Sequence, residues 1–186
     1  NMVDGDQIMA ICANFMKKQG TLKKNTVVVT VMSNLGFTLM GEREGLHIAT
    51  TQVGDRYVLE RMKAEGYNIG GEQSGHIIFL DSNTTGDGML SALRLLEVMV
   101  TEKKPLSKLA SVMEVLPQAL VNAHVPNDRK TSYNDYSEIR EGIRKLEDKF
   151  AGQGRILIRP SGTEPLVRVM IEGKNQNEID RDAHEL

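Results

Sequence analysis

The segment Arg159-Pro-Ser-Gly-Thr-Glu-Pro165 has the composition of an anion-binding turn. Arg159 supplies a planar guanidinium that matches phosphate oxygens, and Ser161 and Thr163 supply hydroxyl donors. Gly162 lets a phosphate approach the backbone amides closely. From the spacing alone, an ordinary turn between two strands is an equally good interpretation. The segment is therefore a candidate phosphate site that needs independent support.

A second polar segment, Gly70-Gly-Glu-Gln-Ser-Gly-His76, holds three glycines in seven residues. The carboxylate of Glu72 and the hydroxyl of Ser74 suit hydrogen bonds to sugar hydroxyls. Taken alone, the spacing favours a glycine-rich hairpin with solvated polar side chains. A lone histidine such as His76 is also more often structural than catalytic.

The loop Thr51-Gln-Val-Gly-Asp-Arg56 leads into a predicted helix. A helix N-terminus attracts anions, and Arg56 would add a positive charge. The simpler interpretation is a helix start with Asp55 in the first turn.

The sequence Asp4-Gly-Asp6 resembles the start of a metal loop. Mg²⁺ needs several hard oxygen ligands, but the next residues are Gln7, Ile8 and Met9. We therefore interpret Asp6 as the N-cap of a helix and predict no metal site in this chain.

Alternating strands and helices are expected to position these loops over residues 1–116. The apolar run 26–31 is typical of a central strand that is covered on both faces. Apolar spacing predicts helices over 6–19, 35–44 and 54–65, and a further helix that the segment 84–91 opens. It predicts strands near 46–49, 67–70 and 76–80. In the last helix, Leu93, Leu96 and Val100 form one apolar stripe. This order predicts a layered α/β/α domain.

A smaller α+β domain with an antiparallel sheet is predicted over residues 117–186, because the pattern changes after Pro117. Strands are expected over 120–125, 155–159 and 166–172, with helices over 136–150 and from 177 onward. The segment 126–134 is a polar loop. Arg168, on the last strand, could reach an anion at Arg159, although a solvent-exposed strand residue is the simpler interpretation.

Composition excludes several classes of protein. The 186 residues carry 23 basic and 25 acidic side chains, a net charge of −2, which argues against a nucleic-acid binder. No apolar run approaches the roughly 20 residues of a membrane span. The single cysteine, Cys12, cannot form an internal disulfide and predicts a reduced, cytoplasmic protein.

Four segments, in this order, resemble those of the phosphohexose mutases, and the resemblance extends over essentially all 186 residues. Because four separate segments agree, the resemblance favours the binding interpretation of the second and the last over simple turns. The segments are Val31–Phe37, Gly71–His76, Thr84–Gly88 and Arg159–Pro165.

The resemblance implies an activity and a set of site residues. Members of the family have four domains around a cleft and move a phosphoryl group between the 1- and 6-positions of a hexose. They use a phosphoserine, Mg²⁺ and a bisphosphorylated intermediate. The third domain reads the sugar, here with Glu72, Ser74, Gly75, His76, Asp55 and Arg56. The fourth holds the phosphate that is not transferred, here with Arg159, Ser161, Gly162 and Thr163.

The family's serine loop and metal loop are both missing from this sequence. The chain thus resembles only the third and fourth domains, and we expect it to bind a hexosamine phosphate weakly and to catalyse no turnover alone. Its partners would be its own first two domains, which would supply the phosphoserine and the Mg²⁺ ligands.

Gln73 and the run Thr84–Gly88 favour the glucosamine branch of the family. That branch passes through glucosamine 1,6-bisphosphate and supplies amino sugars for cell-wall precursors. Two alternatives remain: a substrate of the mannose or glucose series, and a sugar-phosphate-binding module without chemistry.

Overall fold

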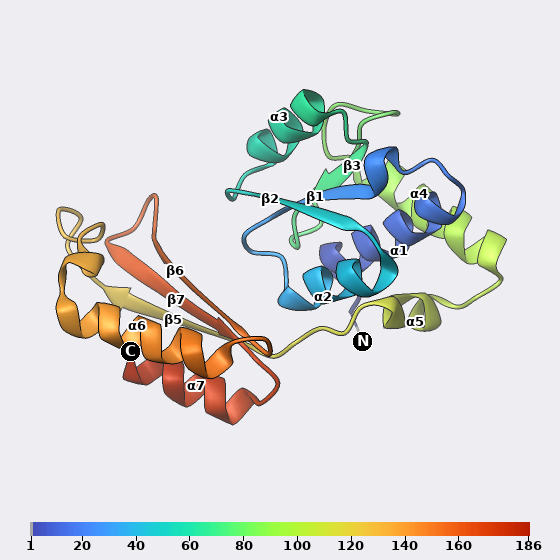
Figure 1. Ribbon diagram of the computed structural model, residues 1–186. Helices are drawn as coiled ribbons and strands as arrows, with labels where there is room; N and C mark the ends of the chain where they lie inside the picture. Colours follow the sequence, from blue (N-terminus) through green and yellow to red (C-terminus); the bar gives the residue numbers. More distant parts are fainter. Residues whose placement is uncertain (1) are drawn as a thin grey trace. The chain divides into compact units, whose positions relative to one another are not determined.

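A four-stranded sheet forms the centre of the first unit of the chain, which ends at Val115. In this computed structural model, which describes residues 2–186, the strand order is β2-β1-β3-β4 (Figure 1). β1 runs parallel to β2 and β3, and β4 pairs antiparallel with β3. All residues of β1 are buried, which confirms the predicted central strand. The strands are β1 (Thr26–Thr30), β2 (His47–Thr51), β3 (Ile69–Gly71) and β4 (Ile77–Phe79).

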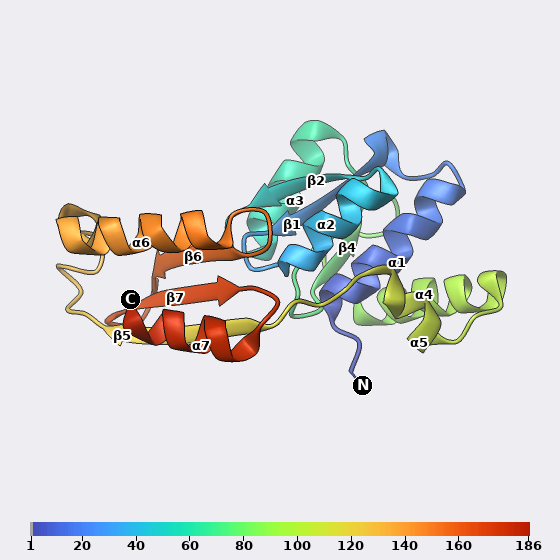
Figure 2. The same ribbon diagram turned by 60° about the horizontal axis from the view of Figure 1, so that its bottom comes forward.

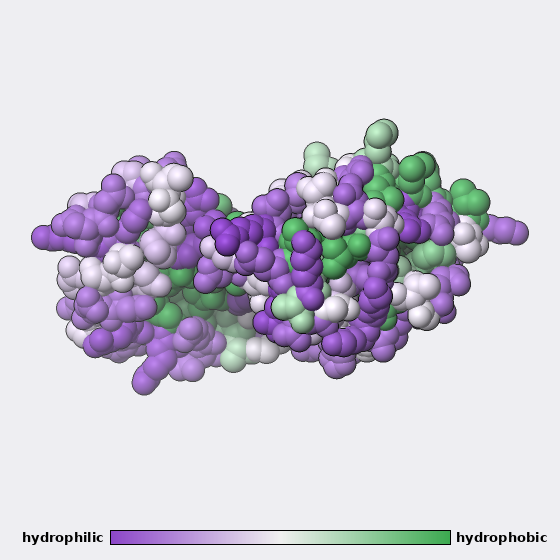
Figure 3. Space-filling view, turned by 90° about the horizontal axis from the view of Figure 1, so that it is seen from above, coloured by the Kyte–Doolittle hydropathy of each residue, from purple (hydrophilic) through white to green (hydrophobic). Residues whose placement is uncertain are grey.

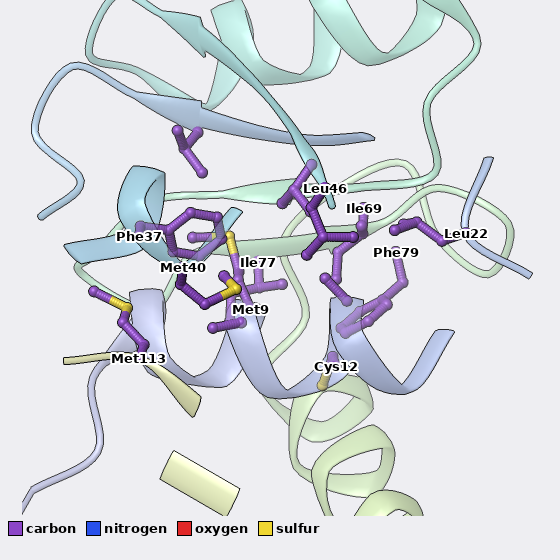
Figure 4. Close-up of a cluster of buried hydrophobic side chains, with 14 residues drawn as sticks. Met9, Cys12, Leu22, Phe37, Met40, Leu46, Ile69, Ile77, Phe79 and Met113 are labelled. Atoms are coloured by element: carbon purple, nitrogen blue, oxygen red, sulfur yellow. The ribbon is translucent and has the colours of Figure 1, made fainter. Parts of the chain in front are cut away.

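Helices cover both faces of this sheet. Val27 and Val29 of β1 face a core shared with α1 and α2, which Figure 4 shows in close-up. Val28, on the opposite face of β1, packs with Val58 and Met62 of α3. The predicted α/β/α layers are therefore present. The helices are α1 (Gly5–Lys18), α2 (Leu35–Glu44), α3 (Asp55–Glu65), α4 (Gly88–Glu102) and α5 (Leu106–Leu109), with short 3₁₀ turns η1 (Lys23–Asn25) and η2 (Ala110–Val112).

The N-cap of α1 is Asp4, so the prediction that Asp6 caps this helix was wrong. Asp4 Oδ1 accepts a hydrogen bond from Gln7 N at 3.0 Å, and Gln7 Oε1 accepts one from Asp4 N at 3.4 Å. This reciprocal pair is a capping box, a pattern that the sequence Asp-x-x-Gln already contains. Asp6 is instead fully buried, and its Oδ2 accepts a hydrogen bond from Asn34 N at 2.7 Å. Asp6 thus ties α1 to the loop that precedes α2.

The apolar stripe of α4 faces solvent. Leu93, Leu96 and Val100 are all exposed, whereas Leu95 and Val98 pack toward α1. The helix is apolar on two faces, and sequence periodicity alone does not indicate which face the neighbouring helix covers.

Cys12 of α1 lies in the core of the first unit (Figure 4). Burial raises the pKa of its thiol to about 12. The folded chain therefore holds the proton more tightly than the unfolded chain. The stability gained in this way is complete below about pH 8.5 and is lost as the pH rises from there to about 12.

We expect iodoacetamide to leave Cys12 unmodified in the native protein at pH 8, because the thiolate is the reactive form. The same thiol should react fully in urea. Mass spectrometry of the two samples measures the difference. If Cys12 reacted as fast in the native protein as in urea, that result would contradict its burial.

The second unit, Leu116–Leu186, is an antiparallel sheet with two helices on one face (Figure 2). The strand order is β5-β7-β6, and both pairings are antiparallel. Leu146 and Phe150 of α6 and Ile179 of α7 pack on the sheet. The predicted α+β architecture is confirmed. The elements are β5 (Gln118–His124), η3 (Tyr133–Asp135), α6 (Ser137–Phe150), β6 (Arg155–Pro160), β7 (Leu166–Glu172) and α7 (Gln176–Glu185).

None of the helices described over residues 2–186 is both long enough and apolar enough to span a bilayer.

Candidate functional site

The predicted sugar loop is a tight hairpin between β3 and β4. Gly75 N donates a hydrogen bond to Glu72 O at 2.9 Å, and Glu72 N donates one to His76 O at 3.1 Å. Gly75 has a φ of +99°, a conformation that residues with a side chain rarely adopt. Ser74 and Gly75 are exposed at the tip, while Glu72 and His76 lie half-buried at its base. The hairpin therefore presents a hydroxyl at its tip above two ionisable side chains.

The start of α3 lies against the base of this hairpin. Gly54 N donates a hydrogen bond to Glu72 Oε1 at 3.1 Å, and Asp55 Oδ2 lies 3.4 Å from His76 Nε2. The structure thus brings together Glu72, His76 and Asp55, which are separate in the sequence. This arrangement fixes a carboxylate and an imidazole beside the exposed Ser74.

Arg56 does not join this group. Its guanidinium is exposed and pairs with Glu60, one turn further along α3, at 2.7 Å. The hydrogen bond from Arg56 to Glu60 is the main reason that the pKa of Arg56 is raised.

The first turn of α1 supports the hairpin. Gly5 N donates a hydrogen bond to Gln73 O at 2.9 Å, and Gln73 Nε2 lies 3.5 Å from Asp4 Oδ2. A Cβ on Gly5 would lie 2.3 Å from Glu72 O, so the loop rests directly on this glycine. On the other side, a Cβ on Gly86 would lie 2.5 Å from His76 Nε2. The sequence did not indicate Gly5 or Gly86 as site residues, because their close contacts with the hairpin arise only in the folded chain.

The carboxylates of Asp4 and Asp6 already accept backbone hydrogen bonds, from Gln7 N and Asn34 N. They do not fit a Mg²⁺ site, which needs several oxygens free to converge on one ion. Over residues 2–186, no group of three or more His, Cys, Asp or Glu side chains is placed to hold a metal ion.

The predicted phosphate loop connects β6 to β7. Ser161 N donates a hydrogen bond to Leu166 O at 2.9 Å, and Ser161 Oγ accepts one from Glu164 N at 3.2 Å. The side chain of Ser161 is buried within the turn that it stabilises, whereas Gly162 and Thr163 are exposed at the tip. The backbone at the tip is therefore exposed to solvent, and the hydrogen bonds of Ser161 stabilise the turn.

Two arginines lie directly opposite each other at the start of this loop. Arg159 on β6 and Arg168 on β7 are cross-strand partners, an arrangement of like charges that destabilises a sheet. Partial burial, and then the nearby Arg168, lower the pKa of Arg159. Within the described chain, no carboxylate pairs with Arg159. An oxyanion held between the two guanidiniums would relieve the repulsion.

Two further charged residues, Glu164 and Lys130, lie beside the two arginines of this loop. Arg168 donates a hydrogen bond to Glu164 Oε2 at 2.8 Å, while its buried Nε–H has no hydrogen-bond partner among residues 2–186. Lys130 Nζ lies 2.6 Å from Ser161 O. Three cations therefore surround the loop against one carboxylate, which favours a bound anion.

Lys130 is a candidate site residue that the sequence did not indicate. It lies in the segment 126–134, which the sequence predicts as a polar loop without a role in the site. Its distance of 31 positions from Ser161 gives no signal in the sequence. The pairing of β5 with β7 brings this segment back to the loop.

Comparison with known protein families shows to which family the chain belongs. A model described as "Phosphoglucomutase/phosphomannomutase, alpha/beta/alpha domain III" matches residues 4–116. The model of the C-terminal domain of the same family matches residues 95–186. The chain belongs to the phosphoglucomutase/phosphomannomutase family. The candidate loops described above lie one in each of these two matched regions.

Relatives within the phosphoglucomutase/phosphomannomutase family are similar along the whole chain. Phosphoglucosamine mutases of Ruminiclostridium cellulolyticum and Clostridium tetani are 60% and 59% identical over 186 residues. The chain spans 41% and 42% of the length of these two proteins, at their C-terminal part. An N-acetylphosphoglucosamine mutase structure from Aspergillus fumigatus matches with a TM-score of 0.80 at 21% identity, over the whole chain and 42% of its own length. That likeness shows the shared fold.

Proposed function

We propose that this chain is the sugar-reading and phosphate-holding part of a phosphoglucosamine mutase. The whole enzyme would interconvert glucosamine 6-phosphate and glucosamine 1-phosphate through a phosphoserine and glucosamine 1,6-bisphosphate. The observation that carries the proposal is the facing pair Arg159 and Arg168, of which only Arg168 has a carboxylate partner, Glu164, among residues 2–186. The identity to phosphoglucosamine mutases, near 60%, supports the substrate branch.

The residues of the first unit would recognise the sugar. Glu72 and Ser74 would hydrogen-bond hydroxyl groups, with Gly75 allowing close approach at the tip. His76 and Asp55, whose Nε2 and Oδ2 lie 3.4 Å apart, would offer polar contacts to the ligand at the base of the hairpin. Arg56 would join them only by leaving its pairing with Glu60.

The second unit would hold the phosphate that is not being transferred. Arg159 and Arg168 would supply fork-shaped guanidinium donors, and the exposed amides at Gly162 and Thr163 would supply further ones. Ser161 would keep the turn in shape, and Lys130 would add charge at its base. Holding the distal phosphate orients the sugar, and orientation accounts for much of the rate enhancement in phosphoryl transfer.

Mg²⁺ would serve the full-length enzyme, with ligands outside the residues described. A related Aspergillus fumigatus structure is described as a complex with GlcNAc-6P and magnesium. Such an ion neutralises charge on the transferring phosphoryl group. The first two domains of the same polypeptide would supply its ligands and the phosphoserine. The reaction would take place in the cytoplasm and feed the synthesis of cell-wall precursors.

An amide titration by NMR tests the proposal. We expect inorganic phosphate to shift only Gly162, Thr163 and their neighbours at millimolar concentrations. Glucosamine 6-phosphate should also shift the hairpin Glu72–His76, and by more than glucose 6-phosphate does. Equal shifts with all three ligands, confined to the phosphate loop, would contradict sugar recognition by this hairpin.

A further inference from the structure

The outer face of α4 is an exposed apolar surface. Met89, Leu93, Leu96 and Val100 have exposed fractions of 81%, 64%, 52% and 75%. Their spacing of four, three and four residues places them in one row, which we call the α4 stripe. The stripe exposes on the order of 500 Å² of apolar side chain, near the upper end of the patches found on soluble monomers. Figure 3, in which hydrophobic residues are green, shows apolar surface at the edge of the unit where α4 lies.

The inner face of α4 is apolar as well. Leu95 and Val98 pack with Ile11 and Phe15 of α1. A helix that is apolar on both faces is typical of a helix enclosed by protein on both sides. The outer face of α3, in contrast, carries charged side chains at Glu60 and Lys63. The row of exposed apolar side chains on α4 is therefore not repeated on α3.

We infer that the α4 stripe is the surface on which the preceding domains of the same polypeptide dock. The relatives have more than half of their length outside the matched region, and the matched models are domain III and the C-terminal domain. The chain enters the first unit at α1, and Val3 packs in the same cluster as Leu95 and Val98 of α4. A domain that precedes α1 therefore joins the unit on the side where α4 lies.

The size of the stripe fits this occupant. Interfaces between domains of one chain bury roughly 600–1,500 Å² in total, so one side contributes an area close to that of the stripe. A stable dimer of separate chains needs about 800 Å² from each partner, which is more than the stripe offers. The inference depends on the family and on the length of the relatives, and it is independent of the substrate proposed above.

Cysteine labelling tests the docking surface. Leu96→Cys is introduced into the full-length protein, and the rate of modification by a maleimide is read by peptide mass spectrometry. The matched control is Ala64→Cys, an exposed position on α3. Cys12 is buried in the native chain, and in urea its peptide is distinguished by mass from the engineered site. We expect Leu96→Cys to react at least about tenfold more slowly than the control in the native full-length protein, and at the same rate in urea.

The same labelling is then measured on the 186-residue chain without the preceding domains. There we expect Leu96→Cys and Ala64→Cys to react at similar rates, because nothing covers the stripe. Equal rates in the native full-length protein would overturn the inference. Protection in the 186-residue chain that grows with protein concentration would also overturn it and would point to a second copy as the occupant. Val100→Cys repeats the test if Leu96→Cys does not fold.

Discussion

Replacing Gly5 with alanine is expected to destabilise the first unit by about 2–3 kcal/mol and to displace the hairpin Glu72–His76. A Cβ at this position would lie 2.3 Å from Glu72 O, 2.7 Å from Gln73 O and 2.7 Å from Gly75 N. All three are backbone atoms, so no side chain can rotate to make room. The hairpin must move away from α1, and the hydrogen bond from Gly5 N to Gln73 O stretches with it.

Gly88→Ala is a matched control for this substitution. Gly5 and Gly88 are each the first residue of a helix, and each follows an aspartate N-cap. A Cβ on Gly88 meets no atom within 4 Å. Alanine there should leave stability unchanged or raise it by up to about 1 kcal/mol, because alanine favours a helix over glycine.

Urea unfolding of the two variants and of the unchanged chain measures the difference. In the full-length enzyme, Gly5→Ala should also lower kcat/KM, whereas Gly88→Ala should not. Equal unfolding midpoints for the two variants would show that the hairpin does not depend on its contact with α1.

Sequence periodicity predicted most of the architecture. The helix 35–44 and the strand 166–172 coincide with α2 and β7, and the strand predicted over 26–31 is one residue longer than β1. The roles of the loops stay a prediction, which rests on the functional groups that Glu72 and Arg159 carry in short segments rich in glycine or proline.

Tertiary contacts explain what the sequence did not reveal. Asp4 and Asp6 are chemically identical, and the buried bond from Asn34 N to Asp6 could not be inferred from the sequence. Lys130 reaches its loop through strand pairing, and the two faces of α4 differ only in what covers them. Each of these features depends on a neighbour that is distant in the sequence.

Arg159→Gln in the full-length enzyme is expected to lower kcat/KM by about a hundredfold while leaving the protein as stable as before, or more so. The loss of activity follows from removing a fork-shaped donor to the distal phosphate. The unchanged stability follows from the geometry: Arg159 is partly buried, lies opposite Arg168 and has no carboxylate partner within the described chain. Its removal ends a repulsion between like charges and breaks no ion pair.

Arg144→Gln is the matched control, since it removes the same charge from an exposed position on α6 of the same unit. It should change neither kcat/KM nor the melting temperature. Arg159→Lys should recover only part of the activity, because an ammonium keeps the charge but loses the fork. The combination of lower activity with retained stability separates a ligand-binding role from a structural one. A structural arginine would lower the melting temperature when removed, and that result would contradict the phosphate site. Residues that a protein keeps at a cost to its own stability are those that a ligand requires. Arg159 meets that description because it faces Arg168 and has no carboxylate partner within the described chain, so that a bound anion would turn the opposition into a favourable contact.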